Sequence, residues 1–139
     1  MYRTEIRVAG RGGQGVLLSG EILARAASMY DNKEALNIGS YGTEARGGKC
    51  RSDVIISDEK IMHPNTTSLD IISVMSAEAF DEYIVDLKDN GVVLVDPDFV
   101  KVTEESLKEK YMLFKMPATD IAYYKLEKPI IANMIMLGA

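Results

Sequence analysis

The sequence contains a single cysteine and a single histidine, and this scarcity excludes several kinds of site. Cys50 alone cannot form an internal disulfide, and it cannot hold an iron–sulfur cluster, which needs several thiolates. His63 is not part of a set of histidine, cysteine and carboxylate residues at zinc-ligand spacing. One histidine also gives no basis for a Ser-His-Asp triad. We therefore expect neither a metal site nor a catalytic residue on this chain.

Positive charge and long apolar runs are also scarce. The 16 lysines and arginines are outnumbered by 21 aspartates and glutamates, for a net charge of -5. This balance argues against a general nucleic-acid binder and against a basic membrane-surface patch. No run approaches the roughly 18 apolar residues of a membrane-spanning helix. Residues 1–6 lack the apolar core of a signal peptide, and one cysteine fits a reducing compartment, so we expect a cytoplasmic location.

What the chain does contain is a regular alternation of strand-like and helix-like segments over 139 residues, enough for one domain with a hydrophobic core. The apolar patterns predict strands over residues 3–9, 34–38, 50–57, 70–75, 92–95 and 111–116, and helices over 16–30, 77–90, 103–110 and 129–137. Ser76 is the expected N-cap of the second helix, and Gly91 the residue that ends it. The β-α-β rhythm predicts an α/β fold: a mostly parallel sheet with helices on both faces, in a Rossmann-like three-layer domain.

A glycine-rich loop separates the first strand from the first helix. Gly10, Gly12 and Gly15 match the spacing G-x-G-x-x-G, and backbone amides at a helix N-terminus form an anion site. Dinucleotide-binding domains add an acidic residue at the end of the second strand, but residues 37–40 contain none, which argues against classical NAD binding. No Gly-Lys-Ser/Thr follows, so the loop is not a Walker A motif. The alternative is that these glycines only allow a tight turn and close packing.

A second loop, residues 39–48, holds four glycines around Tyr41, Glu44 and Arg46. Arg46 can clamp a phosphate or carboxylate, and Glu44 can orient it. The alternative is a solvated loop without a ligand. Because ligands of such sheets bind at the carboxyl ends of strands, and both glycine-rich loops follow strands, both can lie at one edge.

Three motifs together carry a resemblance that spans essentially the whole chain. They are Gly10-x-Gly12-Gly13-Gln14-Gly15-Val16, Ser40-Tyr41-Gly42-x-Glu44-x-Arg46-Gly47-Gly48 and Ser52-Asp53-Val54-Ile55-Ile56-Ser57. In order and spacing they closely resemble the gamma subunit of 2-oxoacid:ferredoxin oxidoreductases, whose substrates include pyruvate, 2-oxoglutarate, 2-ketoisovalerate and indolepyruvate. The resemblance implies one gamma-type domain over residues 1–139, acting inside a multisubunit enzyme and inactive alone.

In such an enzyme a 2-oxoacid is decarboxylated, an acyl-coenzyme A forms, and two electrons pass to ferredoxin. The resemblance implies that thiamine diphosphate and iron–sulfur clusters belong to partner subunits, alpha and beta and in some enzymes delta. It implies that this chain contributes to coenzyme A binding and to assembly. The expected cofactor-binding residues are Gly10, Gly12, Gly13, Gln14, Gly15, Ser40, Tyr41, Arg46, Ser52 and Asn133.

The chain departs from the family in one respect, because members typically continue for some tens of residues beyond its last, apolar helix. We therefore expect that the family's C-terminal tail is missing from residues 1–139. Two other functions are compatible with the residues: a free-standing nucleotide-binding oxidoreductase domain, and a scaffold subunit without a ligand. Binding of NAD by the isolated chain would favour the former, and absence of coenzyme A binding in the complex the latter.

Overall fold

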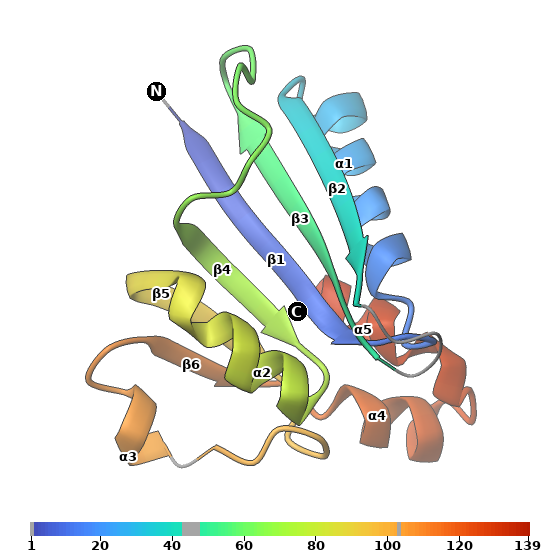
Figure 1. Ribbon diagram of the computed structural model, residues 1–139. Coiled ribbons are helices and arrows are strands. Elements are labelled where there is room, and N and C mark those ends of the chain that lie inside the picture. Colours follow the sequence, from blue (N-terminus) through green and yellow to red (C-terminus); the bar gives the residue numbers. More distant parts are fainter. Residues whose placement is uncertain (1, 43–47, 103) are drawn as a thin grey trace.

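A six-stranded sheet forms the centre of the computed structural model, which describes residues 2–42, 48–102 and 104–139 (Figure 1). Its strands are β1 (Arg3–Arg11), β2 (Glu34–Tyr41), β3 (Lys49–Ser57), β4 (Leu69–Val74), β5 (Leu87–Val95) and β6 (Met112–Lys115). They lie in the order β2-β3-β1-β4-β5-β6. Only β3 runs antiparallel to its neighbours, β1 and β2, and every other adjacent pair is parallel. The sheet is therefore mixed but mostly parallel.

Helices cover both faces of this sheet. They are α1 (Val16–Tyr30), α2 (Ala77–Tyr83), α3 (Glu104–Leu107), α4 (Ala118–Asp120) and α5 (Ala132–Gly138), with short 3-10 or π segments η1 (Ile84–Asp86), η2 (Ile121–Lys125) and η3 (Pro129–Ile131). In Figure 1, α1 and α5 lie on one face and α2 on the other. This arrangement confirms the predicted three-layer α/β fold. Within the described residues no helix is long and apolar enough to cross a membrane.

Each face of the sheet buries its own apolar cluster, because successive strand side chains point to opposite faces. Under α2 the core contains Ala9, Leu69, Ile72, Val74, Ala79, Tyr83, Leu87, Val93, Val95, Val100 and Tyr111. On the opposite face, α4, η2 and α5 pack around Met75, Ala118, Ala122, Ala132 and Met136. β4 is buried on both faces over much of its length, as its continuous apolar run predicts.

The main error of the sequence prediction concerns the second helix. Ser76 does cap α2, with its hydroxyl accepting a hydrogen bond from the Ala79 amide at 3.2 Å. The helix then ends at Tyr83 instead of running to residue 90, because Leu87 is needed in the core, where it is 4% exposed. Asn90 has the positive φ expected of a residue near a chain reversal, 62°, but it lies in β5 at an irregularity in the pairing with β4. The expected helix over 103–110 is likewise shortened to α3, and α4 and η2 follow Pro117 where no helix is predicted.

Candidate functional site

The carboxyl ends of the parallel strands meet at one edge of the sheet, where the first glycine-rich loop leaves β1 (Figure 1). Backbone hydrogen bonds continue the pairing just past the strand ends. The Met75 amide donates to the Ala9 carbonyl at 3.0 Å, and the Asp96 amide donates to the Val74 carbonyl at 3.2 Å. The residues that follow β1, β4 and β5 are therefore held in one row, as expected for a ligand-binding edge of an α/β sheet.

The N-terminus of α1 opens into a hollow of about 270 Å³ at this edge. The lining residues are Gly12, Gly13, Gly15, Val16, Leu17, Leu18, Tyr41 and Cys50. The amides of the first helical turn have no carbonyl partner within the helix. Gly15 stands at the N-cap and offers no side chain to them, and the first turn contains no acidic residue. The positive end of the helix dipole is thus left for an external anion.

The glycine loop is held rigidly by its own side chains and backbone. The Gln14 carboxamide accepts a hydrogen bond from the Arg11 amide at 2.6 Å and donates one to the Met75 carbonyl at 2.9 Å. The Gly12 amide donates to the Gly48 carbonyl at 2.9 Å, which joins the two glycine-rich loops. Gly13 and Gly15 have φ values of 90° and 76°, a backbone conformation that residues other than glycine rarely adopt.

Four of the predicted cofactor-binding residues line the hollow: Gly12, Gly13, Gly15 and Tyr41. Tyr41 is 74% exposed at the end of β2 and comes from the second motif, so the structure joins the two loops as the sequence suggested. Arg46, the predicted phosphate clamp, and Glu44 lie outside the described residues. Their roles stay predictions.

Five other predicted residues lie elsewhere. Gly10 is buried in β1, and the Gln14 side chain is turned back onto the backbone. Ser40 precedes Tyr41 in a strand, so its side chain points to the opposite face of the sheet. Ser52 is fully buried and donates to the Asn37 carboxamide oxygen at 2.5 Å. Asn133 is 5% exposed and donates to the Gly15 carbonyl at 3.2 Å, so it touches the loop from beneath.

Cys50 also lines the hollow, although no sequence pattern indicates that it belongs to the site. It stands directly opposite Gly10 because β3 pairs with β1 in antiparallel register. Burial raises the pKa of its thiol, so it is a poor nucleophile at neutral pH. Predicting this position of Cys50 would require the strand order, which cannot be derived from local sequence patterns.

Charged side chains flank the loop on the α2 face. Arg11 pairs with Glu78 of α2 at 2.7 Å, and Lys49 pairs with Glu82. The Glu78 carboxylate accepts hydrogen bonds from the backbone amide of Glu78 and from the Arg11 side chain, and these lower the pKa of Glu78. These pairs tie α2 to the ends of β1 and β3.

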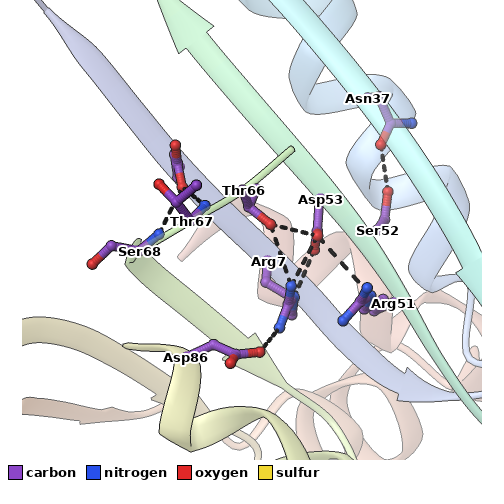
Figure 2. A network of polar contacts seen from close by, with 10 residues as sticks. Arg7, Asn37, Arg51, Ser52, Asp53, Thr66, Thr67, Ser68 and Asp86 are labelled. Atoms are coloured by element: carbon purple, nitrogen blue, oxygen red, sulfur yellow. Dashed lines mark hydrogen bonds and ion pairs between the residues drawn. The ribbon is translucent and has the colours of Figure 1, made fainter. Parts of the chain in front are cut away.

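A second hollow of about 310 Å³ lies farther along the same face, around Arg7. Figure 2 shows the polar contacts of Arg7 with Asp53, Thr66 and Asp86. Arg7 is 3% exposed and binds both carboxylate oxygens of Asp53, at 2.6 and 2.9 Å, and also Asp86. Thr66 donates to Asp53 at 2.9 Å. Burial by itself would lower the pKa of Arg7, but the hydrogen bonds and charges of the two aspartates outweigh it and raise the pKa. The Arg7 donors are already paired with the two aspartates, so we interpret this cluster as structural. Its contacts join β1 to β3 and to the segment before β4.

No group of three histidine, cysteine or carboxylate residues in the described ranges could hold a metal ion. The arrangement at the sheet edge offers amide donors, a helix dipole and apolar walls. It is suited to binding a phosphorylated molecule and holding it, and the described side chains at the hollow supply no acid–base pair for chemistry.

Comparison with known proteins identifies the family. The sequence model of pyruvate ferredoxin/flavodoxin oxidoreductase matches residues 5–139. The 2-oxoglutarate synthase subunit KorC of Methanocaldococcus jannaschii is 50% identical over 137 residues, which cover 99% of this chain and 73% of that protein. The gamma subunit of keto/oxoacid ferredoxin oxidoreductase from Geobacter sulfurreducens superposes with a TM-score of 0.84 at 38% identity, over 99% of this chain and 74% of that one.

A larger solved protein shares the fold. The 2-oxoglutarate:ferredoxin oxidoreductase from Magnetococcus marinus, solved with 2-oxoglutarate, coenzyme A and succinyl-CoA bound, matches all of this chain and 24% of its own, with a TM-score of 0.86 at 24% identity. The family match and the close relatives confirm the resemblance that the three motifs indicate. The chain therefore belongs to the pyruvate ferredoxin/flavodoxin oxidoreductase family, as a gamma subunit of a 2-oxoacid:ferredoxin oxidoreductase.

Proposed function

We propose that this gamma subunit binds the phosphate groups of coenzyme A at the N-terminus of α1 while the assembled enzyme converts a 2-oxoacid into an acyl-coenzyme A. The observation that carries the proposal is the open first turn of α1: Gly15 provides no cap, and no acidic residue occupies that turn. Coenzyme A has a pyrophosphate and a 3′-phosphate, and a phosphate oxygen can accept hydrogen bonds from such amides.

The shape of the hollow suits part of coenzyme A better than all of it. At about 270 Å³ its volume lies just below the range for small-ligand sites, about 300–1,000 Å³. Gly12 and Gly13 present bare backbone to a phosphate group, while Leu17, Leu18 and Tyr41 form an apolar rim for the rest of the ligand. Tyr41 is exposed enough to stack on an adenine ring. We further propose that Arg46 neutralises one of the phosphates.

The remaining chemistry falls to partner subunits under this proposal. The single cysteine within residues 1–139 cannot ligate an iron–sulfur cluster, and we assign the clusters that pass electrons to ferredoxin to the partner subunits. Thiamine diphosphate is likewise assigned to the alpha and beta subunits. The names of the relatives suggest 2-oxoglutarate as the first substrate to test, and the solved protein of the same fold suggests coenzyme A as the first ligand.

The experiment is a charge substitution at the mouth of the hollow, made in the assembled enzyme. Leu18 is 52% exposed in the first turn of α1, and Leu18→Glu places a carboxylate beside the proposed phosphate site. Two charges about 7 Å apart in a medium with an effective dielectric constant of about 40 repel by about 1 kcal/mol, roughly five-fold in affinity. We expect the KM for coenzyme A to rise at least that much, with the KM for the 2-oxoacid unchanged.

The controls separate charge from structure. A glutamate in the first turn favours the helix itself by about 0.3–1 kcal/mol, so Leu18→Glu does not weaken α1. Leu18→Gln matches the shape of Leu18→Glu without the charge, so the difference in the KM for coenzyme A between these two variants isolates the effect of the charge. Met29→Glu places the same charge at the exposed far end of α1 and should have no effect on binding. Equal KM values for Leu18→Glu and Leu18→Gln would contradict the proposal and favour a scaffold subunit.

A further inference from the structure

Asn133 joins the C-terminal helix to the glycine loop. Its side chain is 5% exposed, and its amide nitrogen donates to the Gly15 carbonyl at 3.2 Å. Contact at this point is so close that a Cβ added to Gly15 would lie 2.3 Å from the same nitrogen. In Figure 1, α5 lies beside the N-terminal end of α1. Residue 133 therefore supports the loop from the interior of the protein, away from the hollow.

The contact acts on one particular peptide group. The Gly15 carbonyl also accepts hydrogen bonds from the amide and the hydroxyl of Ser19, both at 3.1 Å. In a planar trans peptide the carbonyl and the next amide point in opposite directions. Because three donors hold the Gly15 carbonyl toward the interior, the Val16 amide is directed out of the helix end, into the hollow.

We infer that Asn133 is a positioning residue for coenzyme A binding, acting through the Gly15–Val16 peptide group. This inference rests on the proposed binding of phosphate groups at α1. It replaces the direct cofactor contact expected for Asn133, since the side chain does not line the hollow. Ser19 belongs to α1 itself, whereas Asn133 comes from a different helix and thus anchors the helix end to the rest of the domain.

The test removes the donor in the assembled enzyme. Asn133→Leu keeps the branching and the number of heavy atoms of the side chain but has no hydrogen-bond donor. We expect the KM for coenzyme A to rise about three- to ten-fold, while kcat and the KM for the 2-oxoacid stay within two-fold of the wild type. The matched control is Thr66→Val, which removes one hydrogen bond to Asp53 on the other face of the sheet and should leave the KM for coenzyme A unchanged.

Asn133→Asp supplies a pH signature that general damage would not produce. Its carboxyl group donates like the amide when protonated but not when ionised. Because residue 133 is buried against the Gly15 carbonyl, the ionised form of this carboxyl group is disfavoured and its pKa should lie well above the ordinary value of about 3.9. We therefore expect its KM for coenzyme A to be high at pH 8, and at pH 6 to fall below that of Asn133→Leu and toward the wild-type value. This variant also keeps the test informative if Asn133→Leu does not fold.

Leu18→Glu, measured in parallel, distinguishes the two ways of failing. If Leu18→Glu leaves the KM for coenzyme A unchanged, the phosphate site is wrong and the inference about Asn133 falls with it. If Leu18→Glu raises that KM but both Asn133 variants match the wild type at every pH, the site stands and the positioning role is overturned. An equal loss for coenzyme A and the 2-oxoacid in the Asn133 variants would also overturn it.

Discussion

Replacing Gly15 by alanine tests the geometry of the loop without any ligand. The residue has a φ of 76°, and left-handed backbone costs a non-glycine residue about 1–2 kcal/mol. The new methyl group would also meet the Asn133 side chain, whose nitrogen lies 2.3 Å from its ideal position. Displacing that buried amide from its hydrogen bond costs about 1–3 kcal/mol.

The two penalties together predict a loss of about 2–5 kcal/mol in the free energy of unfolding, reduced by about 0.4–1 kcal/mol because alanine also restricts the unfolded chain. Urea unfolding of the purified chain measures this directly. With an m-value of about 2 kcal/mol per molar urea, the midpoint should fall by roughly 0.5–2.3 M. Far-ultraviolet circular dichroism before unfolding establishes that Gly15→Ala still folds.

A double-mutant cycle identifies the cause. Asn133→Ala removes the group that the new methyl would strike, so Gly15→Ala should be less damaging in that background than in the wild type. We expect the two changes to be non-additive by at least about 1 kcal/mol, as for residues in contact. Strict additivity, or a loss below about 0.5 kcal/mol for Gly15→Ala alone, would refute the close contact between α1 and α5.

Three further predictions follow from packing, ion pairing and burial. Gly20→Ala should destabilise the chain although alanine favours helices, because a Cβ there would lie 1.9 Å from the Ser52 hydroxyl; a higher urea midpoint would contradict this. Asp53→Asn should lower the free energy of unfolding by about 1.5–3 kcal/mol, since it weakens the charge-assisted hydrogen bonds to the buried Arg7 guanidinium while Asp86 still pairs with it, and a change below about 0.5 kcal/mol would show that the Arg7–Asp53 pair is dispensable. Because burial raises the pKa of the Cys50 thiol, its alkylation by iodoacetamide at pH 8 should be slower than that of free cysteine and should accelerate as the pH rises. Bound desulfo-coenzyme A, which has no thiol to consume the reagent, should slow the alkylation further, and an equal rate with and without this ligand would place the ligand elsewhere.

Local patterns were sufficient wherever an element depends on its own periodicity. The first helix spans residues 16–30 as predicted, because its apolar residues recur at helical spacing and a glycine precedes it. The buried strand β4 is evident from its apolar run, and Ser76 from its capping chemistry. The second helix was predicted too long because Asn90 and Gly91, typical of a helix end, serve a strand irregularity here. Burial of Leu87 in the core is what makes this segment a strand and not the end of a helix.

The candidate site likewise has features that local sequence patterns predict and features that depend on tertiary packing. By itself the sequence determined that a glycine-rich loop stands between a strand and a helix, because bare backbone before an apolar helix is a local feature. Only the tertiary structure decided what surrounds that loop. Insertion of β3 between β2 and β1 sets Cys50 opposite Gly10, and chain folding brings Asn133 onto Gly15 across a separation of 118 residues. Contacts of this kind depend on how whole elements pack, and no spacing along the chain encodes them.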